Sequence, residues 1–307
     1  MMDHSHSTAS WQVAALYKFV ALPEHAELRA PIAQAAQANG LCGTLLIAPE
    51  GINGTVAAPA ESLEAFLVWL QAIEHQNEKP FAALEWKEST ASEKPFRRMK
   101  VRLKREIVTM GVEGIDPRHT VGTYVVAEDW NELIERPDVT LVDTRTDYEV
   151  AIGTFDGAVD PKTRSFGEFP DWAEQNLPED KQAPIAMFCT GGIRCEKSTA
   201  LLKSRGYENV FHLKGGILKY LEQVPETESR WQGECCVFDQ RVSVGHGLVE
   251  GPHELCHACG LPLTPADLLR PQYEAGVSCH NCIGRYTDED RRRFRQRHEQ
   301  REAGRRD

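Results

Sequence analysis

The sequence predicts a multidomain α/β chain, and three observations point to this class. Short apolar strands alternate with helical segments through the first three-quarters of the chain, one buried strand ends in a Cys-Gly-Gly loop, and the last quarter carries two C-x-x-C pairs. A chain of 307 residues can form two or three domains with separate cores. We place these domains at residues 11–112, 122–231 and 233–307.

The first domain, residues 11–112, is predicted to have the element order β-α-β-β-α-β. The expected strands are 13–20, 41–48, 55–57, 81–88 and 96–108, and the expected helices are 24–39 and a second one that Ser62 caps. This order is that of the split βαβ unit, which indicates a ferredoxin-like α+β fold.

The last strand of this domain alternates between apolar and basic side chains. Met99, Val101 and Leu103 share one face of the strand, whereas the basic side chains share the other. These basic residues are Arg98, Lys100, Arg102 and Lys104. Four cations on one face suit the phosphates of a nucleic acid, although lysines and arginines also protect exposed sheet edges from pairing. The net charge of −11 alone does not favour nucleic-acid binding, so this local stripe carries the prediction.

The chemistry is predicted to lie in the stretch 184–197, which reads P-I-A-M-F-C-T-G-G-I-R-C-E-K. A buried strand precedes Cys189, and Gly191 and Gly192 permit a tight loop whose backbone N–H groups point inward. A thiol in such a loop, next to the N-terminus of the following helix, loses its proton easily. We therefore expect Cys189 to be a thiolate that is open to reagents at the mouth of the loop, and not an inert buried thiol.

The third domain, residues 233–307, is predicted to bind zinc. Cys256 and Cys259 form one C-x-x-C pair, and Cys279 and Cys282 form the second. Two such pairs supply the four thiolates of a tetrahedral, structural zinc site, which leaves no open position for catalysis. Cys235 and Cys236 have no evident metal partner. An arginine-rich tail follows and could contact RNA.

Several motifs in the second domain, residues 122–231, resemble the rhodanese family. They are L-V-D-T-R, Y-E, G-T-F-D-G-A-V, the C-T-G-G-I-R loop and V-F-H-L-K-G-G-I. The resemblance implies a parallel α/β fold in which Cys189 is the loop cysteine, held by the amides of Gly191 and Gly192. Arg194 closes the loop and can pair with an anion there. Asp143 and Arg145 are expected to stabilise the fold.

Two further residues of this domain are candidates with open alternatives. Cys195 could resolve an oxidised Cys189 as a disulfide, or it could simply pack against the sheet. Arg164 lies on a predicted loop and could approach a ligand.

The whole arrangement resembles the rhodanese-containing tRNA uridine(34) hydroxylase family, which also has the segment C-V-F-D-Q-R-V-S-V-G-H-G-L. The resemblance implies a tRNA-modifying oxidoreductase that uses molecular oxygen to convert the wobble uridine to 5-hydroxyuridine. Its partner would be the anticodon loop of tRNA. From the residues themselves we predict Cys189, Arg194 and Cys195 as catalytic, with the alternative for Cys195 still open. The sequence identifies neither an electron donor nor an oligomeric state.

Two other functions are compatible with these motifs. One is a persulfide sulfurtransferase acting on a thiol or on tRNA, and the other is a non-catalytic RNA-binding protein. No apolar run approaches membrane-spanning length, and Met1–Ser7 does not resemble a secretory signal. Nine cysteines without such a signal favour a reducing cytoplasm.

Overall fold

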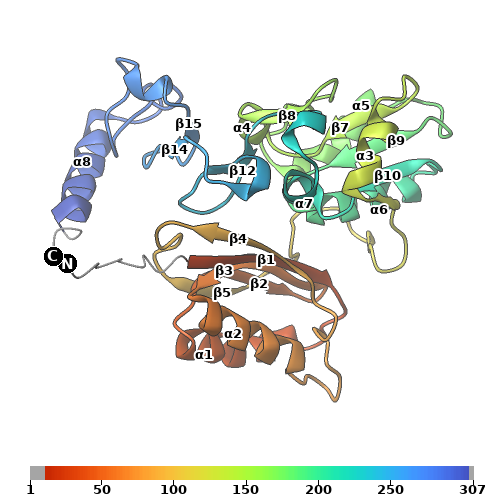
Figure 1. Ribbon diagram of the computed structural model, residues 1–307, viewed down its shortest axis with the longest axis horizontal. Coiled ribbons are helices and arrows are strands. Elements are labelled where there is room, and N and C mark those ends of the chain that lie inside the picture. The colour runs from red at the N-terminus through yellow and green to blue at the C-terminus, as the bar shows by residue number, and fades with distance from the viewer. Residues whose placement is uncertain (1–10, 304–307) are drawn as a thin grey trace, which may run out of the picture.

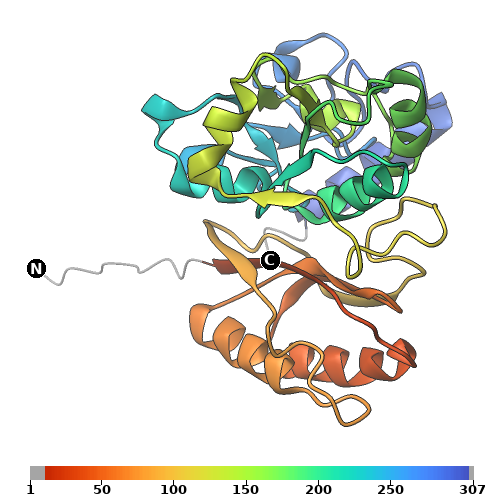
Figure 2. The same ribbon diagram turned by 90° about the vertical axis from the view of Figure 1, so that its right-hand side faces the viewer.

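The computed structural model describes residues 11–303, so the expectation for Met1–Ser7 lies outside the described residues. Figures 1 and 2 show the N-terminal domain below the rest of the molecule, with its helices on the far side of its sheet. The opposite face of that sheet looks toward the middle domain. Within the described range, no helix is both long and apolar enough to cross a membrane.

The N-terminal domain is built on a five-stranded sheet with the order β4-β1-β3-β2-β5. Its elements are β1 (Trp11–Phe19), η1 (His25–Leu28), α1 (Arg29–Ala38), β2 (Cys42–Ala48), β3 (Gly51–Ala58), α2 (Ala60–Ala72), β4 (Trp86–Ala91) and β5 (Met99–Leu103). Strand β3 lies between β1 and β2 and is antiparallel to both, as a split βαβ unit requires. The ferredoxin-like order is present, and β5 adds an edge strand parallel to β2.

Two local predictions for this domain are wrong. Helix α2 begins at Ala60 after Pro59, so Ser62 lies inside the helix and does not cap it. Phe81 and Leu84 lie in a turn before β4, and both are buried in the domain core. Their burial explains why a segment without strand geometry has the apolar pattern of a strand.

The middle domain contains a four-stranded parallel sheet with the order β6-β10-β9-β7. Its elements are β6 (Thr123–Val125), α3 (Ala127–Ile134), β7 (Thr140–Asp143), α4 (Asp147–Val150), β8 (Gly153–Phe155), η2 (Phe166–Glu168), α5 (Phe169–Asn176), β9 (Ile185–Phe188), α6 (Ile193–Ser204), β10 (Val210–Leu213) and α7 (Gly216–Gln223). Parallel strands end at one edge of their sheet, and ligands bind to α/β sheets at that edge. The loop after β9 lies there.

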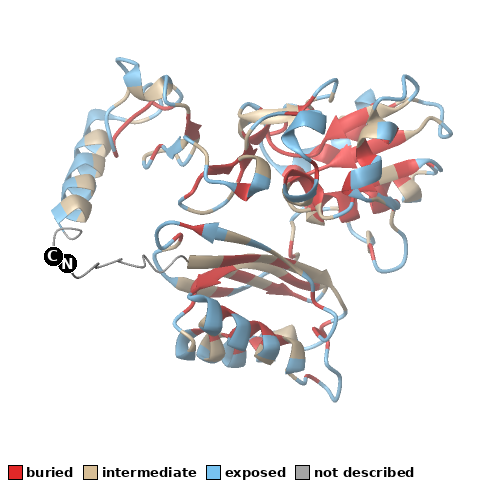
Figure 3. Ribbon diagram, in the orientation of Figure 1, coloured by how far each residue is buried: buried red, intermediate tan, exposed pale blue. Residues whose placement is uncertain are grey.

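The remainder of the chain has an attached part and a projecting part. Its elements are η3 (Glu226–Glu228), β11 (Trp231–Gly233), β12 (Cys235–Cys236), β13 (Ser243–Val244), η4 (His246–Leu248), β14 (Glu254–Leu255), β15 (Pro262–Leu263), η5 (Asp267–Leu269) and α8 (Asp288–Ala303). Strand β11 pairs with β8, and Cys235 and Leu248 pack into the core of the middle domain. Helix α8 buries none of its residues (Figure 3). Burial raises the pKa of Cys235, so this thiol is an inert core residue.

Residues of the motif stretch hold the first two domains together. The Lys197 ammonium group, only 3% exposed, lies 2.8 Å from a carboxylate oxygen of Glu50 and 2.6 Å from one of Glu106. The Tyr17 hydroxyl of β1 donates to the Glu196 carboxylate at 3.0 Å. The last two residues of C-T-G-G-I-R-C-E-K therefore dock the rhodanese-like loop on the N-terminal sheet.

Candidate functional site

The loop between β9 and α6 wraps around the sulfur of Cys189. The Gly192 amide donates to Cys189 Sγ at 3.1 Å, and Gly192 has a φ of +100°, which glycine adopts readily. The glycine at position 216 is required by close packing, because a Cβ atom there would lie 2.5 Å from the Cys189 carbonyl oxygen. One glycine from each Gly-Gly pair, Gly192 and Gly216, therefore helps to shape the loop around one thiol.

The surroundings of Cys189 favour its ionised form. Burial opposes ionisation, but the Cys195 thiol, the Arg194 guanidinium and the backbone amides of both residues outweigh burial and lower the pKa of Cys189 to about 5. Burial and the neighbouring Cys189 raise the pKa of Cys195, so Cys195 stays a thiol and donates a hydrogen bond to the Cys189 sulfur. The pKa of about 5 favours the thiolate form of Cys189 at neutral pH.

Arg194 pairs with an anionic side chain of the protein itself. Its guanidinium makes two hydrogen bonds with the Glu149 carboxylate, at 2.7 and 2.8 Å, and a third with the Thr190 hydroxyl at 3.2 Å. Burial of Glu149 opposes its ionisation, but the charge and hydrogen bonds of Arg194 outweigh burial. The pKa of this carboxyl is therefore lowered to about 2. The anion that Arg194 binds is thus a side chain of the protein, and Arg194 acts on Cys189 through its charge.

Cys195 lies in the same buried cluster as Cys189. Its sulfur is 3.6 Å from the Thr144 hydroxyl. Asp143 and Arg145 form a fully buried ion pair with a distance of 2.6 Å, and Arg145 also donates to the carbonyl oxygens of Glu149 and Gly153. These two residues brace the loop after β7, as the sequence analysis expected.

Cys189 is 0% exposed, so the expectation of a thiol open at the mouth of its loop is wrong. The N-terminal sheet covers the loop, and Cys189 instead lines a cavity of about 320 Å³ between the two domains, together with Gly191 and Arg194. This volume lies within the range of small-ligand sites, about 300–1,000 Å³. Cys189 therefore borders a partly open cavity whose volume suits a small planar group.

The opposite wall of this cavity comes from the N-terminal sheet. Tyr17 and Lys87 lie on neighbouring strands, and the Lys87 ammonium group is 5.2 Å from the centre of the Tyr17 ring. Burial lowers the pKa of Lys87, and the nearby Cys189 opposes this shift. Neither residue was predicted from the sequence. The only signal was their place on the sheet face away from the helices, and nothing local linked that face to a loop a hundred residues later.

The basic strand lies on this same sheet face. Lys100 and Arg102 pair with Thr44 and Leu46, whereas Val101 pairs with the core residue Leu45. Arg98 and Lys100 line a second cavity of about 710 Å³, which shares residues 237–239 with the cavity of Cys189. Arg102 and Lys104 are exposed farther along the edge. Arg164 is exposed on a loop whose Phe166 lines the first cavity.

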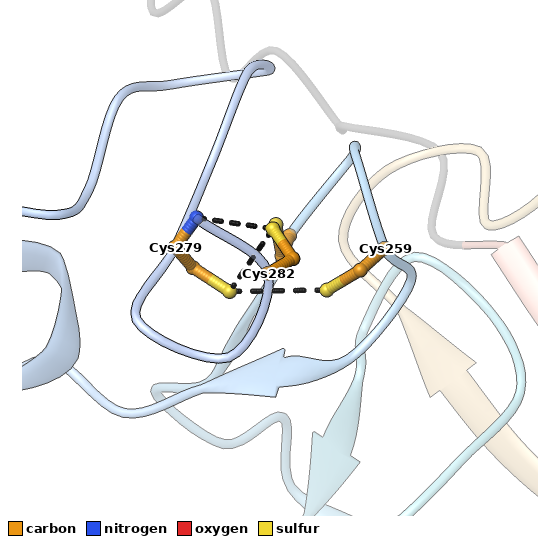
Figure 4. A group of neighbouring side chains, drawn as sticks. Cys259, Cys279 and Cys282 are labelled. Carbon is orange, nitrogen blue, oxygen red and sulfur yellow. Dashed lines mark hydrogen bonds between the residues drawn. The ribbon is translucent and has the colours of Figure 1, made fainter. Parts of the chain in front are cut away.

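The four cysteines of the C-x-x-C pairs come together in the projecting part of the chain. Figure 4 shows three of them, Cys259, Cys279 and Cys282. Their ligand atoms all lie within 4.8 Å of one another, and the sulfur–sulfur distances are 3.9 Å for Cys256–Cys282, 3.8 Å for Cys259–Cys279 and 3.7 Å for Cys279–Cys282. A zinc tetrahedron with bonds of about 2.3 Å has edges of about 3.8 Å. The cluster could therefore hold a metal ion of this size.

Two family models match the chain. One, described as a UPF0176 acylphosphatase like domain, matches residues 11–107, and one described as a rhodanese-like domain matches residues 126–223. Among solved structures, the rhodanese-like domain of an Anabaena protein is 23% identical with a TM-score of 0.31, covering 37% of this chain and 80% of that one.

Curated relatives match almost the whole chain. A protein of Rhizobium etli is 57% identical, covering 97% of this chain and 94% of its own. A protein of Sinorhizobium fredii is 58% identical, covering 94% of this chain and 90% of its own. Both are named tRNA uridine(34) hydroxylase. This similarity confirms the resemblance found in the sequence, and the chain belongs to the tRNA uridine(34) hydroxylase family.

Proposed function

We propose that this protein is an enzyme that hydroxylates the wobble uridine of tRNA at C5, using molecular oxygen. The observation that carries the proposal is the place of Cys189, whose pKa favours the thiolate, at the wall of the cavity between its own loop and the N-terminal sheet. A base in a single-stranded anticodon loop can be turned out into such a cavity, whereas a base in a duplex is held by stacking and pairing. Family membership supports the same reaction.

The proposed chemistry begins with bond formation between Cys189 Sγ and C6 of uracil. The electrons of the C5–C6 double bond move toward C5 and O4, so that C5 becomes nucleophilic and bonds to dioxygen. A thiol reductant in solution supplies two electrons and two protons, is oxidised to a disulfide, and releases one oxygen atom as water. Loss of the C5 proton and of the Cys189 thiolate then restores the double bond and leaves a hydroxyl group on C5.

Residues around the cavity have separate roles in this sequence. Lys87 stands where its ammonium group can donate to O4 as negative charge develops there, and its lowered pKa suits proton transfer. Arg194 keeps Cys189 ionised both before attack and as it leaves. Cys195 holds a proton at the thiolate, and its hydrogen bond orients the sulfur.

The tRNA backbone is proposed to follow the basic strand. Lys100 and Arg102 lie on β5 and Arg98 and Lys104 flank it, and Arg98 and Lys100 line the cavity beside that of Cys189. Arg164 approaches from the loop that also carries Phe166. A phosphate chain bound along these cations would deliver a turned-out base to the thiolate. We place this activity in the cytoplasm, where tRNA is modified and where thiols stay reduced.

Nucleoside mass spectrometry tests the proposal. Unmodified tRNA incubated with the purified protein, a thiol reductant and oxygen should gain 5-hydroxyuridine at position 34, and the same mixture without oxygen should not. A persulfide sulfurtransferase would instead place a sulfane sulfur on Cys189 and thiolate an acceptor without oxygen. If the protein binds tRNA firmly but leaves it unmodified, it is a non-catalytic RNA-binding protein and the proposal is contradicted.

We further propose that Cys256, Cys259, Cys279 and Cys282 hold one structural zinc ion, which supplies a cross-link to a segment with little core of its own. Removal of the metal with a chelator, or the Cys282→Ala substitution, should unfold residues 254–287 and leave the first two domains folded. Elemental analysis should give one zinc per chain for the intact protein. Limited proteolysis should then cleave the metal-free segment first, and equal resistance with and without metal would contradict the proposal.

A further inference from the structure

A large aromatic side chain stands in the open beside the cavity of Cys189. Phe238 is 61% exposed, and it lies on the hairpin that connects β12 to β13. Most exposed apolar residues are scattered and need no explanation. Phe238 differs because it lines both the cavity of Cys189 and the neighbouring cavity of the basic strand.

The hairpin that carries Phe238 is fixed to the N-terminal sheet. Arg241, which is buried, donates to the Ser89 hydroxyl at 2.8 Å and to the Thr90 carbonyl oxygen at 3.1 Å. The same guanidinium lies 2.6 Å from the Asp239 carboxylate. These contacts join strand β4 to the hairpin, so the hairpin holds the exposed Phe238 ring in a fixed position.

The hairpin also contains backbone strain. Val242 has a φ of +64°, which is rare for a β-branched residue because its side chain crowds the backbone. Strained conformations persist where the surroundings enforce them, and they gather at functional sites. Here the contacts of Arg241 hold the backbone of the hairpin in this conformation, and they thereby fix the position of Phe238.

The cavity on the far side of Phe238 combines the two features that bind a nucleotide. Arg98 and Lys100 supply positive charge on one wall, and Phe238 supplies a flat apolar surface. The Asp239 carboxylate beside the ring is already paired with Arg241, so its charge does not oppose a phosphate there. Proteins that bind single-stranded RNA stack bases on aromatic rings and track the phosphates with cations.

We infer that this second cavity binds the nucleotide next to the target uridine, with its base stacked on Phe238 and its phosphate on Arg98 and Lys100. The inference rests on the proposed function and adds a subsite to it. The occupant is single-stranded RNA, because the cavity adjoins the one that receives the target base and shares residues 237–239 with it. One side of Phe238 then faces the flanking base and the other side borders the space of the reacting base.

The test compares three substitutions at one exposed position. Phe238→Ala should weaken binding of an anticodon stem-loop RNA by about 5- to 100-fold, the range expected for one stacked base. It should raise KM by a similar factor and leave kcat at saturating RNA nearly unchanged. Phe238→Trp should retain binding, whereas Phe238→Leu should lose it almost as fully as alanine, since leucine is apolar but has no ring.

The controls separate this subsite from the proposed function. Leu269→Ala removes another exposed apolar side chain, which is 86% exposed in the Cys-rich segment, and should change neither Kd nor KM. Lys100→Gln should reduce the slope of log Kd against log salt by about 0.7, as expected for one phosphate contact on a single strand. Normal hydroxylation by Phe238→Ala with unchanged Kd and KM would overturn the subsite alone. Absence of hydroxylation by the wild-type protein would instead overturn the proposed function, whatever the binding data show.

Discussion

Cys189→Ser is expected to reduce the rate of uridine hydroxylation by about a thousand-fold or more, because the variant loses the nucleophile that activates C5. Serine keeps the size and the amide contacts of the cysteine, but its hydroxyl does not ionise at neutral pH. The measurement is single-turnover formation of 5-hydroxyuridine in tRNA. The free energy of unfolding should change little, so a loss of rate cannot be attributed to unfolding.

Cys42→Ser is the matched control. Cys42 is also fully buried, and its thiol donates to the Ala57 carbonyl oxygen at 3.4 Å, a hydrogen bond that serine can keep. It lies in a separate cluster of the N-terminal domain, so the variant should react within a few-fold of the wild-type rate. Full activity of Cys189→Ser would refute covalent activation through this thiol.

The pH dependence of the wild-type rate follows from the ionised fraction of the same thiol. The pKa of Cys189 is about 5, so the rate should be constant above roughly pH 6. Below pH 5 it should fall about tenfold per pH unit as the thiolate takes up a proton. If the cysteine had an ordinary pKa, the rate would still rise between pH 7 and 9.

Features encoded within a few residues were predictable from the sequence. The strand before Cys189, the Gly191-Gly192 turn and the helix after it are one local pattern. The clustering of the two C-x-x-C pairs was likewise predictable, because each pair makes a turn that presents two sulfurs on one side. The ferredoxin-like order followed from the alternation of strand and helix periods.

Features that depend on contacts between distant segments were not predictable in this way. Tyr17 and Lys87 look like ordinary sheet residues until the middle domain docks on them. The partner of Arg194 is Glu149, 45 residues earlier, and only the fold brings the two together. The burial of Cys189 has the same origin, since the covering sheet belongs to another domain.

The ion pair of Arg194 and Glu149 permits a prediction that separates charge from stability. Arg194→Gln and Glu149→Gln each break the same buried pair, whose side chains are 10% and 1% exposed. Each variant leaves a buried charge without its partner, so each should lose about 3–5 kcal/mol of unfolding free energy. Denaturant unfolding of both proteins measures this loss.

Their effects on the thiol should differ in sign. Arg194→Gln removes a positive charge beside Cys189, so the pKa of Cys189 should rise by about 1–3 units and the pH–rate profile should move to higher pH. The rate lost at pH 7 through this shift should return near pH 9. Glu149→Gln removes a negative charge and keeps the guanidinium, so its profile should stay in place or move to lower pH.

This contrast decides what Arg194 does in the reaction. A purely structural residue would give two equally unstable variants with the same pH–rate profile, because only the fold would have changed. A guanidinium that binds the reacting base directly would give a loss in Arg194→Gln that high pH does not restore. Recovery at high pH in one variant, with no alkaline shift in the other, is the pattern expected if Arg194 serves to hold the charge of the Cys189 thiolate.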